Sequence, residues 1–283
     1  MTILRSGFAD LTAGARHLLI VASRPWEYRH LIMAMAEREF TSRFRSSVLG
    51  SLWAVLQPVA VVLLFYYVFA VIFSARWGAS NASGAHYIVG IFSGLIVYNI
   101  FAETVGRSVA CISGNPNYVT KIKFPVSILP IVLLVFSLLN FAVSLAVLFA
   151  FGLIGGAVTL SPAILAIPLA LFSLVTWSIG VAWIVSAANV YFRDTSVVVP
   201  LLLQALMFLS PVFYEVEQSN TLVKSIIRLS PLTSPITALR EIVFLGKLPA
   251  VGEFFVPAIT GVAVMIIGYL FFARARKGFA DVI

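Results

Sequence analysis

The sequence predicts an all-α membrane protein with six transmembrane helices, an N-terminal amphipathic interface helix and short re-entrant helices between spans five and six. Hydrophobic residues make up 61% of the 283 positions, and charged residues make up only 11%. Soluble domains carry about 25% charged residues, so a soluble chain this apolar could not cover its surface. Residues 52–73 contain no charge, and a rise of about 1.5 Å per residue lets such a helix cross the hydrocarbon core.

The uncharged runs predict where the chain crosses the membrane. We place the spans at residues 52–73, 86–107, 125–153, 162–188, 196–214 and 254–273. They form one transmembrane domain, 51–273, between an N-terminal cytoplasmic segment, 1–50, and a cytoplasmic tail, 274–283. The fourth run alone would also suit the core of a soluble protein, but not beside five others. Gly and Pro within the runs are compatible with spans, because neighbouring helices can satisfy the freed backbone groups.

Basic residues between the spans predict the orientation of the chain. If the N-terminus is cytoplasmic, that side carries fourteen Lys and Arg residues and the other side carries five. Cytoplasmic loops of membrane proteins carry such an excess, so we expect both termini in the cytoplasm. The net charge of +8 is then explained by orientation and by lipid headgroups, and no nucleic acid partner is expected.

A densely charged stretch, residues 28–50, precedes the first span. Its charges are densest at Arg38, Glu39, Arg43 and Arg45. On a helix, one side would carry Met33, Ala36, Phe40 and Phe44. We predict a helix that lies at the membrane surface and leads into the first span. The alternative is a plain positively charged anchor.

The connection between spans two and three, residues 108–124, contains a strong turn signal. This signal is Gly114-Asn115-Pro116-Asn117, and Tyr118, Lys121 and Lys123 follow it. The connection is either a passive loop or a short helix that contacts a cytoplasmic partner.

The segment 215–253 is long for an idle loop and too apolar to be one. Apolar stretches at 222–229 and 236–245 are too short to span, which favours helices that dip into the membrane and return. Such helices must be buried in protein or line a cavity, so the segment is a candidate gate. A flat surface hairpin is the alternative. The candidate gate residues are Pro211, Pro231, Pro235 and Arg240.

Motifs of several enzyme classes are missing from the sequence. It contains no G-x-x-x-x-G-K-[ST] phosphate loop, so we do not expect it to hydrolyse ATP by that device. The three histidines are scattered, and the only cysteine, Cys111, has no metal-ligand cluster around it. We therefore expect no catalytic residue, no metal and no cofactor in this chain.

Ionisable residues are scarce within the spans. Glu103 and Arg107 lie four positions apart near the cytoplasmic end of the second span, a spacing that suits a salt bridge. Ionisable residues in spans mark ion pathways in many transporters, but a structural pair at the headgroup level is the simpler interpretation here. Arg193-Asp194 closes the fourth span in the same way. A proton- or sodium-driven carrier therefore lacks its usual residues here, so the energy must come from elsewhere, which points to a separate ATPase subunit.

Aromatic residues crowd several spans and have two interpretations. They could form lipid-facing belts, which is their commoner use in membrane proteins. They could instead line a conduit and stack on sugar rings. The candidate channel-lining residues are Phe65, Tyr66, Phe69, Phe73, Tyr98, Phe208 and Tyr214.

A series of short motifs in fixed order resembles ABC-2 type permeases. It starts with Arg38-Glu39-Phe40, Arg43-Phe44-Arg45-Ser46-Ser47-Val48-Leu49-Gly50, Leu52-Trp53 and Gln57-Pro58. It continues with Asn115-Pro116, Tyr191-Phe192-Arg193-Asp194, Ser210-Pro211-Val212-Phe213-Tyr214, Ser230-Pro231-Leu232-Thr233, Arg240 and the tail Gly278-Phe279-Ala280-Asp281-Val282-Ile283. More closely, the chain from about residue 28 resembles the transmembrane subunit of O-antigen and teichoic-acid polysaccharide ABC exporters. Glu215-Val216-Glu217 departs from the proline-marked turn expected there.

The resemblance implies a homodimeric channel in the bacterial inner membrane, with two copies of a separate nucleotide-binding subunit that binds ATP and Mg. It implies that ATP drives export of a lipid-linked polysaccharide. By position, residues 38–45 would be the interface helix, residues 115–123 the coupling helix, and the segment after Tyr214 the gate helices. The residues expected to couple to the ATPase are Arg38, Glu39, Arg43, Arg45, Asn115, Pro116, Tyr118, Lys121 and Lys123.

Two alternatives remain open at this point. The nearer one is an ABC-2 permease for another cargo, such as teichoic acid, capsule, a lipid or a drug. The other belongs to a different class, a membrane-embedded transferase acting on lipid-linked sugars. A transferase would need an acid, a base or a metal site within the membrane, and the sequence shows none.

Overall fold

The computed structural model describes residues 26–43, 47–72, 84–120, 124–215, 227, 230–249 and 251–282, and these parts are mostly helical and contain no strand. In these parts, five helices are long and apolar enough to cross a membrane. They are Gly50–Phe69, Gly84–Ser108, Val126–Ile154, Pro162–Tyr191 and Phe254–Gly278. The prediction of an all-helical, multi-pass membrane protein is confirmed.

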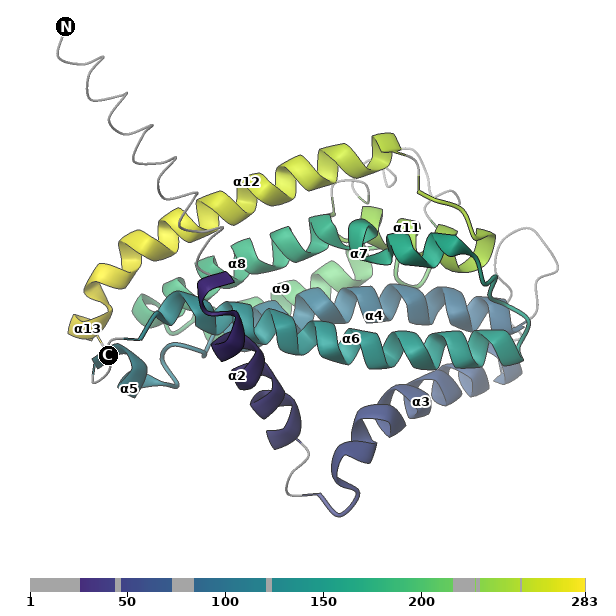
Figure 1. The fold of residues 1–283 in the computed structure, drawn as a ribbon, viewed down its shortest axis with the longest axis horizontal. Coiled ribbons are helices and arrows are strands. Elements are labelled where there is room, and N and C mark those ends of the chain that lie inside the picture. Colours follow the sequence, from purple (N-terminus) through teal and green to yellow (C-terminus); the bar gives the residue numbers. More distant parts are fainter. Residues whose placement is uncertain are drawn as a thin grey trace, which may run out of the picture.

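The spanning helices are built from the segments drawn in Figure 1. The first span joins a short 3-10 turn, η1 (Gly50–Leu52), to α3 (Trp53–Phe65) and a π-helix, η2 (Tyr66–Ile72). The second is α4 (Gly84–Ser108), and the third joins η3 (Val126–Ile128) to α6 (Leu129–Ile154). The fourth joins η4 (Pro162–Ala166), α7 (Ile167–Ala170) and α8 (Phe172–Tyr191), and the last is α12 (Val251–Ala275).

The predicted fifth span, 196–214, is shorter in the structure. Helix α9 (Thr195–Leu209) has 15 residues and a length of about 22 Å, less than the roughly 30 Å of a hydrocarbon core. It ends because Ser210, which precedes Pro211, has the extended backbone that a following proline favours (φ −95°, ψ 151°). The helix therefore ends five residues before the predicted span end at 214, and both that span end and the count of six spans stay predictions.

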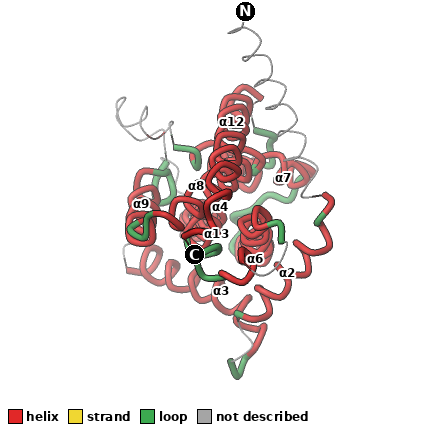
Figure 2. The backbone as a smooth tube through the Cα atoms, turned by 90° about the vertical axis from the view of Figure 1, so that its left-hand side faces the viewer, coloured by secondary structure: helices red, strands yellow, loops and turns green. Residues whose placement is uncertain are grey.

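Helix α4 forms the centre of the bundle. Within its apolar window 78% of the residues are buried, compared with 6% for the first span. Figure 2, which looks along the bundle, shows α4 surrounded by α6, α8 and α9, while α3 lies at the periphery. The first span therefore offers most of its surface to lipid or to another protein.

Helices α8 and α12 cross at glycines. A Cβ atom added to Gly268 would lie 2.8 Å from the carbonyl carbon of Gly180, and one added to Gly180 would lie 2.6 Å from the carbonyl oxygen of Val264. Small residues let helix backbones approach closely in a membrane, where dispersion contacts rather than water exclusion drive association. Gly180 and Gly268 thus hold the last span against the fourth.

The N-terminal helix α2 (Arg29–Ser42) crosses α6 at a steep angle, as an interfacial helix would (Figure 1). Its buried residues are Ile32 and Ala36, which pack on Ile128 and Val132. The predicted apolar side included Met33, which is 55% exposed, so that part of the prediction is wrong by about one residue. Ala36, on the predicted side, is buried, and Ile32 takes the place of Met33 in the side that packs on α6.

Short helices gather at the two ends of the bundle. At one end lie α5 (Pro116–Thr120), the 3-10 turn η7 (Arg276–Gly278) and α13 (Phe279–Val282), with α13 contacting α5 (Figure 1). The Tyr191 hydroxyl donates to the Ala275 carbonyl (2.7 Å), and Phe279 is buried 5.7 Å from the ring of Phe272. At the other end lie α11 (Thr233–Arg240) and a π-helix, η6 (Glu241–Leu245).

Candidate coupling and transport sites

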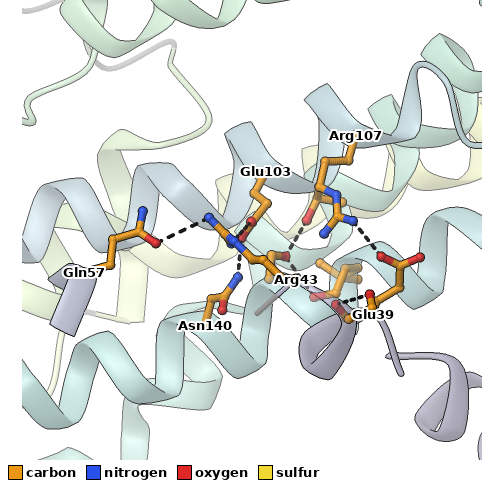
Figure 3. A network of polar contacts seen from close by, with 10 residues as sticks. Glu39, Arg43, Gln57, Glu103, Arg107 and Asn140 are labelled. Carbon is orange, nitrogen blue, oxygen red and sulfur yellow. Dashed lines mark hydrogen bonds and ion pairs between the residues drawn. The ribbon is translucent and has the colours of Figure 1, made fainter. Parts of the chain in front are cut away.

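Two Glu-x-x-x-Arg pairs, one at the end of α2 and one on α4, bind each other across the helices (Figure 3). Arg43 Nη1 lies 2.9 Å from Glu103 Oε1. Arg107 Nη2 lies 2.7 Å from Glu39 Oε2. The sequence interpretation paired Glu103 with Arg107, whereas the ion pairs that the structure places on each of them run to α2. The crossed pairing arises because α2 docks with Glu39 and Arg43 facing α4.

The crossed ion pairs extend to two further spans. The Asn140 amide of α6 donates to Glu103 Oε2 (2.8 Å), and Arg43 Nη2 donates to Gln57 Oε1 of α3 (3.5 Å) (Figure 3). The Arg107 guanidinium lies 4.3 Å from the centre of the buried Phe136 ring. This polar network joins α2 to the first three spans, so α2 cannot be displaced without disturbing these contacts.

A cavity of about 210 Å³ opens beside this network, between α3, α4 and α6. Its floor is buried and mostly apolar, with Phe92, Ile96 and Phe141. Its polar lining residues are Arg43, Gln57, Asn99, Glu103, Ser137, Asn140 and Ser144. This cavity is not among the sites predicted from the sequence, although the amides within otherwise apolar spans are a signal that could have indicated it.

The predicted coupling segment contains a short helix, α5, as one of the two interpretations expected. The Asn115 amide donates to the Cys111 carbonyl (3.0 Å), and the Tyr118 ring stacks on Phe124 with centroids 4.6 Å apart. Asn115 and Pro116 are exposed. Lys121, Lys123 and Arg45 lie outside the described residues, and Arg38 is exposed on α2.

The turn before α5 is anchored to the end of α8. The Asn189 amide donates to the Ser113 hydroxyl (3.1 Å), and the side chains of Cys111 and Ser186 form a hydrogen bond. Burial raises the pKa of Cys111 to about 12, while its hydrogen bonds act in the opposite direction. The sole cysteine is therefore a packed thiol beside the coupling segment.

Arg240 occupies the centre of the predicted gate segment. Its guanidinium donates to the carbonyls of Gly90 (2.9 Å), Val212 (2.8 Å) and Tyr214 (3.3 Å), and the residue is 8% exposed. Burial lowers the pKa of Arg240 to about 9, and the charge of Glu215 opposes this shift. Arg240 thus fastens α11 to α4 and to the stretch that follows α9.

The Ser-Pro breaks of the gate segment come together in space. The hydroxyls of Ser210 and Ser230 lie 2.8 Å apart, Pro211 and Pro235 are buried, and Pro231 is half-buried. The second apolar stretch, 236–245, forms α11 and η6 and is held by the Thr159 amide, which donates to the Val243 carbonyl (2.9 Å). The first stretch, 222–229, lies outside the described residues except for Ile227.

The candidate channel aromatics occupy different environments. Tyr66 and Phe208 are 41% and 59% exposed, while Tyr98 is 8% exposed and donates to the Leu203 carbonyl (3.0 Å). Phe65 and Phe69 pack together with centroids 5.8 Å apart, and the Tyr214 hydroxyl donates to the Phe208 carbonyl (3.1 Å). Phe73 lies outside the described residues. Tyr98 has little surface left for a sugar ring, and the channel role of the set stays a prediction.

Together these features define a multi-pass helical membrane protein in which the N-terminal helix α2 is bound to the spans by crossed ion pairs. Among the described residues, no group of three His, Cys, Asp or Glu could hold a metal ion. The chain belongs to the ABC-2 type transporter family, which matches residues 30–244. The resemblance seen in the sequence is thereby confirmed.

The chain is also similar to curated permeases over nearly its whole length. It is 28% identical over 263 residues to an O-antigen export system permease protein RfbA of Myxococcus xanthus, covering 90% of this chain and 96% of that protein. Two proteins of the same name from Klebsiella pneumoniae are each 24% identical over 254 residues, covering 89% of this chain and 95% of each relative.

Proposed function

We propose that this chain is the channel-forming subunit of an ATP-driven exporter that moves a lipid-linked, O-antigen-like polysaccharide across the bacterial inner membrane. The observation that carries the proposal is its similarity to O-antigen export permeases over about nine-tenths of the chain. The nearest alternative is an ABC-2 permease for another cargo, such as teichoic acid, capsule, a lipid or a drug. The experiment described below separates the two by identifying the cargo.

The proposed assembly is a homodimer with two copies of a separate ATPase, which binds ATP and Mg. The first span and α9 support a second copy because their apolar surfaces are open. Leu63 and Leu64 are 55% and 62% exposed, and Leu201 and Leu202 are 64% and 62% exposed. A channel between two copies would cover part of this surface.

We propose that α9 makes the sixth crossing together with the stretch 210–214. Helix α9 starts directly after the Tyr191 end of α8. Arg240 holds Val212, beyond its other end, at the level of Gly90 on α4. Six crossings agree with both termini on one side, which the distribution of Lys and Arg assigns to the cytoplasm.

Helices α2 and α5, which we place on the cytoplasmic side, would have different roles in coupling to the ATPase. Exposed Arg38 and the exposed start of α5 would contact the ATPase, with Arg45, Lys121 and Lys123 adding positive charge. Glu39 and Arg43 are bound to α4, so they would transmit movement of α2 to the spans. This assignment divides the predicted coupling residues into a docking group and a transmitting group.

The experiment that tests the proposal compares cells with and without the gene and then the purified components. Deletion should remove the surface polysaccharide and leave lipid-linked polymer inside, and the wild-type gene should restore export. The purified chain should hydrolyse no ATP without its partner ATPase. Normal surface glycans in the deletion strain would assign the chain to another cargo. ATP hydrolysis by the purified chain alone would refute the proposal that a separate subunit is the ATPase.

A further inference from the structure

The cavity between α3, α4 and α6 has polar side chains whose hydrogen-bonding groups are not used by the described protein. Exposed Asn99 and half-buried Ser144 line it, and the side chain of neither makes a hydrogen bond to any described residue. Asn99 lies nine residues before the end of α4, about 14 Å along the helix axis. An unsatisfied amide at membrane depth costs several kcal/mol, so this site favours a polar occupant.

The wall formed by α3 adds backbone and side-chain groups. Pro58 and Ala54 both line the cavity, and Pro58 has no N–H to donate to the Ala54 carbonyl four positions earlier. Gln57 lies between them and uses its side-chain oxygen for Arg43. The cavity therefore combines a backbone acceptor, amides and hydroxyls on three different spans.

The charges at the cavity compensate each other. Arg43 and Glu103 form an ion pair, so the lining residues carry no net charge. A phosphate would require uncompensated cations, preferably in bidentate geometry. Neutral hydroxyl groups instead match the amides of Asn99 and Asn140 and the hydroxyl of Ser144, while buried Phe92 and Ile96 suit the C–H face of a ring.

We infer that this cavity binds a single neutral, hydroxyl-rich ring of a lipid-linked glycan, beside its lipid anchor. The volume of about 210 Å³ is below the roughly 300–1,000 Å³ of sites for drug-sized ligands, so one ring fits better than an oligosaccharide. The inference rests on the proposed function, because it names a contact of the proposed substrate. The glycerol headgroup of a phospholipid offers similar hydroxyl chemistry and must be distinguished.

The test uses the complete permease–ATPase complex in vesicles and a photoreactive dodecyl β-glucoside with a diazirine next to its sugar. Labelled peptides are mapped by mass spectrometry. Competitors are dodecyl β-glucoside, dodecyl phosphocholine and phosphatidylglycerol. The variants are Asn99→Leu, Asn99→Ser and Ser144→Leu. The matched control is Thr260→Val, because Thr260 of α12 is exposed and does not line the cavity. Its hydroxyl donates to the Val256 carbonyl (3.0 Å) and accepts from the Trp177 indole (3.4 Å).

The inference predicts labelling within residues 92–103 and 137–144 that dodecyl β-glucoside alone displaces. Loss of one hydrogen bond should weaken labelling about fivefold in Asn99→Leu. Ser144→Leu should weaken it by filling the cavity, whereas Asn99→Ser should keep most of it and Thr260→Val all of it. Export of the native glycan should fall in the two leucine variants.

Three results would overturn the inference. The first is labelling of the wild-type complex that is confined to peptides outside the cavity. Equal displacement by phosphatidylglycerol or dodecyl phosphocholine would assign the cavity to bulk lipid. Unchanged labelling in both leucine variants would show that these side chains bind nothing. A complex that exports no glycan but is labelled in the cavity would refute the proposed function and keep the cavity assignment.

Discussion

Arg43 and Glu103 lie 60 positions apart in the sequence, yet their side chains form an ion pair 2.9 Å long between the end of α2 and the central helix α4. A second pair, Arg107 with Glu39, runs in the opposite direction between the same helices. Together they give α2 a defined register on the bundle. This register is what would allow an ATPase bound at α2 to move the spans.

The crossed pairs predict a specific rescue. Reversing Glu103 to Arg should repel Arg43 and uncouple ATP hydrolysis from transport, while Arg43→Glu combined with Glu103→Arg should restore part of the coupling. We expect an interaction energy of about 1 kcal/mol in the double-mutant cycle, because the side chains are 38% and 20% exposed. Glycan export per ATP hydrolysed is the measurement. A double variant as impaired as the sum of its single variants would contradict a direct pairing.

The close crossing of α8 and α12 predicts that a Gly→Ala substitution in α12 lowers stability at the crossing and not away from it. Gly268→Ala should destabilise the protein by about 2 kcal/mol, because the added carbon meets the Gly180 backbone at 2.8–2.9 Å and backbone cannot swing aside. Gly252→Ala on the same helix is the matched control, since nothing lies within 4 Å of its Cβ position. Thermal unfolding in detergent measures both. Equal stability of the two variants would show that α8 and α12 can separate at no cost.

The contacts of Arg240 predict that stability and export depend on the shape of its side chain as well as on its charge. Arg240→Lys should lose about 2–3 kcal/mol of stability, because an ammonium cannot reach the carbonyls of Gly90, Val212 and Tyr214 with the same fork. Thermal unfolding and glycan export are measured together. Full activity in this variant would mean that the positive charge alone is sufficient.

Gly94 supplies an independent test of the same contact. A Cβ atom at Gly94 would lie 3.0 Å from Arg240 Nη2 and 3.0 Å from the Cα of Val212. Gly94→Ala should therefore shift the guanidinium and cost about 1 kcal/mol, with a smaller loss of export than Arg240→Lys. Thermal unfolding of the single and double variants is the measurement. Additive effects of the two substitutions would contradict a shared contact.

Cys111 predicts slow thiol chemistry in the folded protein. Burial raises its pKa to about 12 from the ordinary 9, so at pH 8 the thiolate fraction is about a thousandfold smaller than in the unfolded chain. The sign is that of an acid whose neutral form is favoured: stability should fall as pH rises from 9 towards 12. The rate of maleimide labelling of Cys111 in the wild-type complex measures its reactivity, and labelling of the protein unfolded in denaturant is the control. Rapid labelling of the folded complex at pH 8 would contradict a packed thiol.

Much of the fold could be predicted because lipid imposes simple requirements on the sequence. The boundaries at 86–107 and 125–153 lie within two residues of the helices Gly84–Ser108 and Val126–Ile154, since each run must satisfy its backbone internally. The turn signal at 114–117 left a passive loop and a short helix both open, and the structure has the helix α5. Apolarity alone does not give the end of helix α9, because it continues through Val212 and Phe213 after Pro211 has ended the helix.

The site could be predicted only in part. Glu103 and Arg107 were noted as ionisable residues within an apolar span, and Glu39 and Arg43 as part of a densely charged stretch. Spacing along one helix paired Glu103 with Arg107. Spacing within a helix carries no information about which neighbour a helix meets, so the crossed pairing could not be derived from it. The cavity was missed for the same reason, because Gln57, Asn99 and Asn140 are isolated amides until three spans bring them together.

The sequence by itself determined that this chain is an all-helical membrane protein, where most of its spans lie and to which family it is similar. These properties depend on local apolarity and on short motifs, which neighbouring residues specify. Only the tertiary structure decided that Arg43 binds Glu103, that Ser210 meets Ser230 and that Arg240 holds three carbonyls. These contacts depend on helix docking, where the packing of whole surfaces fixes which distant polar groups satisfy one another.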